Sequence, residues 1–507
     1  MNKKTMAVSS VVLSSMLFLS ACGSSGNQAS TTTPSSTATE KTPSSNEKSV
    51  ELNVAFPIFG AVPKDIIAVQ EAINQISLKK INATVKLTPI SIGDWQQQNN
   101  LMLTSNEKLD LMAVLGNNYS NLVAKNQVLP LSKLLDQQGE GIKKSLDPAY
   151  LNAAKVKGDI YAVPTIRDLA ANYGILMKKE IVDKYKIDTT KIKTLDDVEA
   201  VLKTVKDGNP NFTPLVPSAV GRSFTEEYVP FDNLGDYIGV LPNYDNDLKI
   251  VNLYESKDYA DFVKKMRSWY SAGYILKDAA TNKDSQFDLI KANKGFAYLS
   301  KQKPGFEVNE TKSVGQPMVA VSLIPPVATT STVTSIMWGI PRNTKTPEKA
   351  MAFLNLMYAD KDIINLFDWG IEGKHYVKKS DNVIDYPEGV NSSNSGYNLN
   401  MGWLFGNQFL SYVFNGDEPN LWKNMDEFNK SAKKSKALGF IFDVTPIKTE
   451  YAAVTNVVKQ YKLPLETGSV DPDTVLPDFI AKLKSAGMDK IIAEKQKQLD
   501  EWAKSNK

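Results

Sequence analysis

Two residue types that often build catalytic and metal sites are nearly missing from this chain of 507 residues. It contains one cysteine, Cys22, and one histidine, His375. A single histidine excludes metal sites built from several histidines, and a Ser-His-Asp triad would have to use His375. The 59 basic and 56 acidic residues nearly cancel, and no dense basic run occurs. Nucleic acid is therefore not an expected partner.

The sequence also has no apolar run of membrane-spanning length. The apolar stretch near its start, AVSSVVLSSMLFLS, has about 14 residues, or roughly 21 Å as a helix, whereas a hydrocarbon core is about 30 Å thick. Lys3 and Lys4 precede this stretch, and the small residue Ala21 follows it. A positive start, an apolar middle and a small residue predict a secretory signal peptide over residues 1–21.

The four residues Leu19-Ser20-Ala21-Cys22 resemble the bacterial lipobox. The resemblance implies that the Cys22 sulfur carries a diacylglyceryl group, which anchors the chain to the membrane. Each buried CH₂ contributes about 0.8 kcal/mol, so two or three acyl chains hold stably where one binds reversibly. An acylated Cys22 leaves no free thiol and no disulfide, which excludes thiolate catalysis, zinc–thiolate sites and redox work. The alternative is an ordinary cleaved signal whose cysteine is incidental.

Residues 22–49 have the composition of a flexible tether. Ser, Thr, Gly and Pro dominate and no large apolar residue occurs, so this stretch cannot bury enough surface to offset ordering. The globular part begins at VELNVAF and continues for about 450 residues, longer than one hydrophobic core usually grows. Two lobes are therefore expected.

The first globular segment alternates strands and helices. VELNVAFPIF reads as a strand, and ATVKLTPI alternates as a second strand. The stretch between them has apolar residues at helical spacing, namely Ile66, Val69, Ile73 and Ile76. Such alternation predicts a parallel sheet with helices on its faces, and ligands bind beyond the carboxyl ends of such strands. The strand-end loops PIFG and GNNYS are therefore expected to contact ligand.

Two longer stretches resemble a known family. GDIYAVPTIRDLAANYGILMKKEIVDKY is similar to the segment in which bacterial extracellular solute-binding proteins cross from the first lobe to the second. TSIMWGIPRNTKTPEKAMAFLNLMYADKDIINLFDWGIEGKHY resembles the family's return to the first lobe. GIEGKHYV and the C-terminal KLKSAGMDKIIAEKQKQLDEW resemble a narrower branch, the large Gram-positive lipoproteins of carbohydrate-type ABC importers, with an extended C-terminal region.

The resemblance implies an α/β, two-lobe periplasmic-binding-protein fold, each lobe a mostly parallel sheet flanked by helices, with an interlobe cleft and hinge. It implies no cofactor and no catalysis. It implies a monomer outside the cytoplasm that captures a sugar or oligosaccharide and delivers it to ABC permease subunits, held to the membrane through its lipid anchor only. The expected division is lobe 1 in residues 50–165 plus 335–385, and lobe 2 in residues 166–334 plus 386–507.

Candidate ligand contacts in the first lobe come from the strand-end loops. Phe59 offers an aromatic face, and Asn117 and Asn118 offer amides for hydroxyl groups, with Tyr119 beside them. An Asn before an aromatic residue is also ordinary turn chemistry. Arg167 and Asp168 fall at the expected crossing, where they contact ligand or pair with each other.

Further candidates lie in the second lobe and the return segment. Sugar sites combine aromatic faces with short polar side chains, so the return strand offers Trp338, and the glycine-flanked GIEGKHY offers His375 and Tyr376. A strand Trp is as often a core residue, and His375 also fits a structural, hydrogen-bonded role. The remaining candidates are Asp232, Asn233, Trp403 and Asn407.

Three other functions remain open from the sequence. A glycoside hydrolase needs two carboxylates about 5–10 Å apart, and nothing in the sequence marks such a pair. A peptide or amino-acid binding lipoprotein needs fixed partners for an ammonium and a carboxylate, for which Arg167 and Asp168 are available. A surface adhesin without a transporter would lack neighbouring permease genes.

Overall fold

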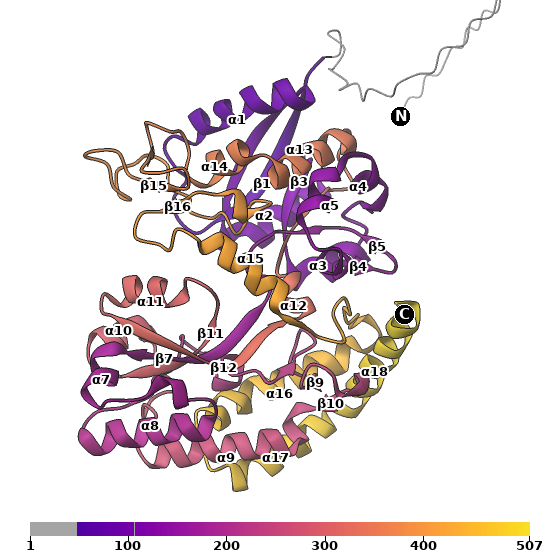
Figure 1. The fold of residues 1–507 in the computed structure, drawn as a ribbon. Helices are drawn as coiled ribbons and strands as arrows, with labels where there is room; N and C mark the ends of the chain where they lie inside the picture. Colours follow the sequence, from indigo (N-terminus) through magenta and orange to yellow (C-terminus); the bar gives the residue numbers. More distant parts are fainter. Residues whose placement is uncertain (1–47, 106, 507) are drawn as a thin grey trace, which may run out of the picture. The chain divides into compact units, whose positions relative to one another are not determined.

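The computed structural model of the chain describes residues 48–105 and 107–506. Residues 46–507 form one compact unit, which contains two larger β-sheets with separate hydrophobic cores and helices packed on them (Figure 1). The predicted signal peptide, Cys22 and the tether up to residue 47 lie outside the described residues. Among the helices of the described ranges, none has the length and apolar content that a membrane crossing requires.

The first sheet has five strands. In spatial order they are β2 (Ala83–Ser91), β1 (Val50–Ile58), β3 (Leu111–Leu115), β13 (Ile336–Gly339) and β6 (Val163–Pro164). β1 runs parallel to β2 and β3, whereas β13 is antiparallel to β3 and β6 because it enters from the second sheet. The second half of β1 is buried on both faces, which explains its unbroken apolar sequence.

Helices cover the first sheet (Figure 1). They are α1 (Ile66–Ile81), α2 (Ile92–Thr104), α3 (Gly116–Ala124), α4 (Ser132–Gln138), α5 (Glu140–Ser145), α6 (Pro148–Asn152), α13 (Pro347–Ala359) and α14 (Lys361–Asp368). α1 buries Ile66, Val69 and Ile73, so the helix predicted from their spacing is confirmed. GNNYS was predicted to be a loop, and that prediction is wrong, because Gly116 already begins α3.

The second sheet has the order β11 (Ala297–Gln302), β7 (Ala171–Lys178), β12 (Met318–Ala328) and β17 (Lys433–Lys434). β7 is antiparallel to both β11 and β12. The expected mostly parallel sheet is therefore wrong for this lobe. The physical reason is the chain path: β7 leads away from the first lobe and β12 returns toward it, so the two neighbours must run in opposite directions.

Residues 397–410 pack with the first lobe, which corrects the predicted boundary after residue 385. Tyr397, Met401, Leu404 and Phe405 are buried in the same core as the first sheet. A small sheet joins β14 (Val377–Lys378), β15 (Val383–Asp385) and β16 (Val413–Phe414). This stretch has little periodicity, so sequence patterns did not reveal which core it completes.

The chain passes between the lobes three times. The first passage follows β6, the second contains α12 (Thr330–Val333), and the third runs from α15 (Leu421–Ser431) into β17. Helices α16 (Lys448–Glu466), α17 (Pro472–Ser485) and α18 (Met488–Ser505) then pack on the second lobe beside α9 (Lys257–Ser271). α17 ends and α18 begins on either side of Gly487.

Candidate ligand-binding cleft

A cavity of about 690 Å³ lies between the two lobes at the carboxyl end of β3. Its walls come from α3 in the first lobe, from α12 in the second passage, and from second-lobe and C-terminal residues. The polar side chains of the lining are those of Asn117, Ser120, Asn121, Asp236, Thr330, Ser331, Thr334, Ser335, Asp443, Thr445 and Tyr451. Such a lining offers many hydroxyl and amide groups to a ligand.

Gly116 allows α3 and the segment after α12 to approach each other closely. A Cβ added at Gly116, the first residue of α3, would lie 2.5 Å from the Thr334 carbonyl oxygen. The Gly116 N–H also donates to the Ser335 carbonyl at 3.0 Å. Any larger residue at this position would therefore push α3 away from the passage that follows α12.

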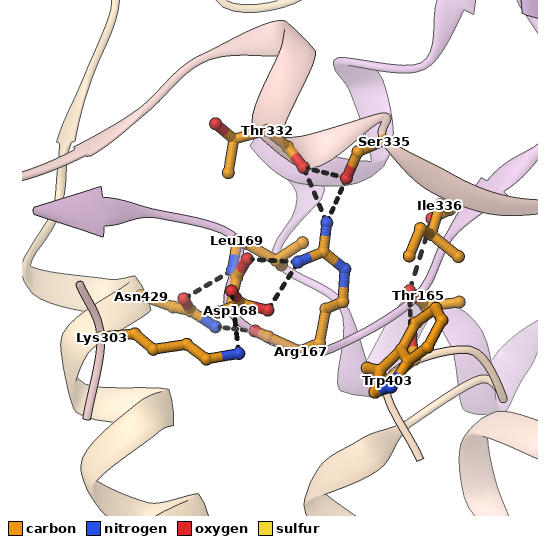
Figure 2. A network of polar contacts seen from close by, with 10 residues as sticks. All are labelled: Thr165, Arg167, Asp168, Leu169, Lys303, Thr332, Ser335, Ile336, Trp403 and Asn429. Atoms are coloured by element: carbon orange, nitrogen blue, oxygen red, sulfur yellow. Dashed lines mark hydrogen bonds and ion pairs between the residues drawn. The ribbon is translucent and has the colours of Figure 1, made fainter. Parts of the chain in front are cut away.

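A buried ion pair lies beside the cavity, on the first passage between the lobes (Figure 2). Arg167 and Asp168 are 7% and 8% exposed, and the guanidinium donates to the Asp168 carboxylate at 2.5 Å. It also donates to the Thr332 carbonyl at 3.1 Å and to the Ser335 hydroxyl. The pair therefore links the first passage to the second, and Ser335 belongs both to this network and to the cavity wall.

Positive charges from the second lobe complete this network. Lys303 lies 3.2 Å from the second Asp168 carboxylate oxygen. Burial acts to raise the pKa of Asp168, but the charges of Arg167, Lys303 and Lys301 outweigh it and hold that pKa well below its usual range. Burial lowers the pKa of Lys301 itself to about 8. Asp168 is therefore an ionised carboxylate whose charge is balanced by neighbouring cations of the protein.

The third passage binds the same short segment. The Asn429 side chain in α15 donates to the Arg167 carbonyl at 2.6 Å and accepts from the Leu169 N–H at 2.9 Å (Figure 2). The Thr165 hydroxyl donates to the Trp403 carbonyl at 3.0 Å. Residues 165–169 are thus hydrogen-bonded both to α15 and to the segment that contains Trp403.

Two aromatic residues predicted as contacts meet at the end of β1. The Phe59 side chain is exposed, at 65%, and its ring centre lies 5.9 Å from that of the half-buried Trp403. Neither residue belongs to the lining of the cavity. This pair offers a flat apolar face on the first lobe.

Four predicted contacts are core residues in the structure, which corrects their proposed role. Trp338 is fully buried and its indole N–H donates to the Leu404 carbonyl at 2.6 Å. The Tyr119 hydroxyl donates to the Ala154 carbonyl at 2.5 Å, and Tyr376 packs in the core of the small sheet. His375 is 1% exposed, accepts from the Ile371 N–H and lies 3.0 Å from Asp65. Aromatic rings gain most by burial, and the polar atoms of Trp338, Tyr119 and His375 already have partners within the protein.

The other predicted residues have intermediate outcomes. Asn117 lines the cavity, whereas Asn118, on the same helix, is half-buried outside the lining. Asp232 is buried, and burial raises its pKa; its carboxylate accepts from the Leu234 N–H at 2.9 Å. Asn233 accepts from the Ser331 hydroxyl at 3.3 Å, so it supports a cavity residue. Asn407 is buried and its amide donates to the Tyr358 carbonyl.

Sequence reasoning missed two parts of the lining. The run TTSTVTS at 329–335 has an unusual density of hydroxyl groups, a signal that was available. The segment from Phe440 to Thr445 carries no recognisable motif. Within the described ranges, no group of three or more His, Cys, Asp or Glu residues has a metal-binding arrangement.

Two family models match the chain. Residues 65–363 match the bacterial extracellular solute-binding protein family, and residues 436–504 match a domain of unknown function. A carbohydrate ABC transporter substrate-binding protein of Streptococcus pneumoniae serotype 4 is 30% identical over 445 residues, 86% of this chain and 87% of that protein.

A solved structure is also similar. The N-glycan transport solute binding protein NgtS of Streptococcus pneumoniae is 27% identical with a TM-score of 0.79, over 91% of this chain and 100% of that one. Complexes of NgtS with Man1GlcNAc and with Man5GlcNAc match with TM-scores of 0.68 and 0.66, over 90% and 91% of this chain and 100% of each NgtS chain. The two-lobe α/β fold expected from the sequence is therefore confirmed.

Proposed function

This chain belongs to the family of bacterial extracellular solute-binding proteins, and we propose that it captures a sugar or oligosaccharide between its lobes and delivers it to an ABC importer permease. The observation that carries the proposal is the cavity between the lobes. Its hydroxyl, amide and carboxylate groups match the rim of a sugar, and its aromatic residues match the flat C–H faces. A few placed polar groups among apolar ones are what fixes a small ligand.

Capture by this architecture requires a hinge. Ligand stabilises the closed arrangement of the lobes only if it binds that arrangement more tightly than the open one. Walls from both lobes line the cavity, so a sugar that contacts α3 and the second lobe together meets this requirement. The chain then releases its solute unchanged, as a binding protein and not as an enzyme.

The buried ion pair argues against the peptide alternative. A peptide or amino acid needs a cation for its carboxylate and an anion for its ammonium. Arg167 and Asp168 were the available candidates, but they neutralise each other at 2.5 Å and are nearly inaccessible. An uncharged ligand such as a saccharide does not require either charge.

The first test measures thermal unfolding with Man1GlcNAc, Man5GlcNAc and a mixture of short peptides. A ligand that binds only the folded chain stabilises it by about 2.7 kcal/mol at a concentration of 100 Kd. We expect a concentration-dependent rise in Tm with at least one glycan and none with peptides. A rise with peptides alone would overturn the saccharide assignment, and release of monosaccharides during incubation would overturn the binding-only role.

The second test removes cavity amides on α3. Asn117→Ala and Asn121→Ala are each expected to weaken Man5GlcNAc binding about threefold to tenfold, since a hydrogen bond contributes about 0.5–1.5 kcal/mol. Asn118→Ala is the matched control on the same helix, because Asn118 lies outside the lining. Calorimetric titration should give Asn118→Ala an affinity within twofold of wild type. Equal losses in all three variants would contradict the placement of the ligand.

We further propose that Cys22 carries the lipid that holds the chain at the membrane near its permease, which raises the effective concentration of the two partners. A Cys22→Ala variant is expected to appear in the soluble fraction of the culture, whereas the wild type stays with the membranes. Fractionation followed by immunoblotting measures this. Membrane retention of the variant would contradict the anchor.

A further inference from the structure

We propose that the C-terminal region matched by the domain of unknown function helps to determine which oligosaccharide binds. Its residues in the cavity lining, called the C-terminal wall below, contact the outer rings of the ligand. The inference rests on the proposed function and deepens it. Its basis is position: residues from Phe440 to Thr445, together with Tyr451, line the same cavity as Asn117 and Ser120 of α3. All of these C-terminal residues fall within the matched range 436–504.

The segment contacts α18 through two hydrogen bonds and one aromatic pair. The Asp443 N–H donates to the Gln498 side chain at 2.9 Å, and the Gln498 amide donates back to the Asp443 carbonyl at 2.9 Å. The ring centres of Phe440 and Trp502 lie 6.2 Å apart in an edge-on arrangement. A wall fixed before ligand arrives loses little entropy when ligand binds.

The segment is also joined to the second passage between the lobes. The Thr330 hydroxyl donates to the Ala437 carbonyl at 3.1 Å and accepts from the Gly439 N–H at 2.8 Å. Thr330 itself lines the cavity. The chain just before the C-terminal wall is therefore hydrogen-bonded to α12, which also lines the cavity.

The chemistry of the wall suits hydroxyl-rich rings. The Asp443 carboxylate accepts from the Thr445 N–H at 2.9 Å, and the Thr445 residue is exposed. Asp236, beside this wall, is paired at 2.6 Å with the fully buried Lys495 of α18. Carboxylates are acceptors for sugar hydroxyls, and the half-buried Phe442 adds an aromatic face.

The size of the cavity favours a ligand of more than one ring. Its volume of about 690 Å³ lies within the range of about 300–1,000 Å³ that holds drug-sized ligands. In this proposal one ring of the glycan lies against α3, and a further ring contacts the C-terminal wall.

The experiment adds bulk to the wall and compares two glycans. We expect Thr445→Trp to weaken Man5GlcNAc binding at least tenfold by calorimetric titration and Man1GlcNAc binding less than threefold. Thr474→Trp is the matched control, because Thr474 is an exposed threonine of the same C-terminal region that lies outside the cavity. It is expected to bind both glycans within twofold of wild type, and Tm in the absence of glycan checks that each variant folds.

The outcomes separate this inference from the proposed function. Normal binding of Man5GlcNAc by a folded Thr445→Trp would overturn the C-terminal wall and leave saccharide capture intact. An equal loss in Thr474→Trp would also overturn it, since the effect would not depend on the cavity. A wild-type chain that binds neither glycan nor any other saccharide would overturn both.

Discussion

Replacing Arg167 with alanine is expected to lower the free energy of unfolding by about 3–5 kcal/mol, the cost of removing one partner from a buried ion pair. The variant leaves the Asp168 carboxylate buried without its closest cation, 2.5 Å away in the wild type. It also removes the donors to the Thr332 carbonyl and the Ser335 hydroxyl. Urea unfolding followed by circular dichroism measures the loss.

Lys303→Ala is the matched control for this prediction. Lys303 also contacts Asp168, at 3.2 Å, but its side chain is 37% exposed. Exposed ion pairs contribute about 0–1 kcal/mol, so the control should cost less than about 1 kcal/mol. If both variants lose the same stability, the Arg167–Asp168 pair is not the centre of the network.

Replacing Asp368 with asparagine is expected to change how stability depends on pH. Asp368 is buried at the end of α14, and its carboxylate accepts from the Ser411 hydroxyl at 2.5 Å. Burial raises the pKa of Asp368 from 3.8 to about 6. A raised folded-state pKa means that the folded chain holds the proton more tightly, so this group's contribution is present at low pH and is lost as pH rises through about 6.

The size of this effect follows from the rise of the Asp368 pKa by about two, because a pKa change of one is equivalent to about 1.4 kcal/mol. The stability of Asp368→Asn relative to wild type should therefore rise by up to about 3 kcal/mol between pH 3.5 and pH 7.5. Asp381→Asn, at an exposed position, should track the wild type over this range. Denaturant titrations at several pH values measure both, and a constant difference for Asp368→Asn would contradict the prediction.

Local patterns predicted the elements of the first lobe well. The spacing of Ile66, Val69 and Ile73 marks one buried helix face, and β1 reads as a strand because its apolar residues are continuous. Arg167 and Asp168, where the crossing was expected, lie between β6 of the first sheet and β7 of the second. These features depend on residues close together in the chain.

The site was harder to predict because burial depends on distant residues. Trp338 looked like a sugar platform, but Phe405, 67 positions later, covers it, with ring centres 6.1 Å apart. Asn117 and Asn118 look alike in the sequence, and only the orientation of α3 decides which one lines the cavity. The segment 440–445 enters the cavity because Gln498 holds it, a contact that no local pattern announces.

One side chain cluster has a consequence for the order of folding. Arg167 is hydrogen-bonded to Thr332, 165 positions later, and to Asn429, 262 positions later. Closing loops of this length is entropically costly, and contacts of high sequence separation form slowly. The network of hydrogen bonds around Arg167 should therefore be among the last parts of a nascent chain to form, after each sheet has acquired its own core.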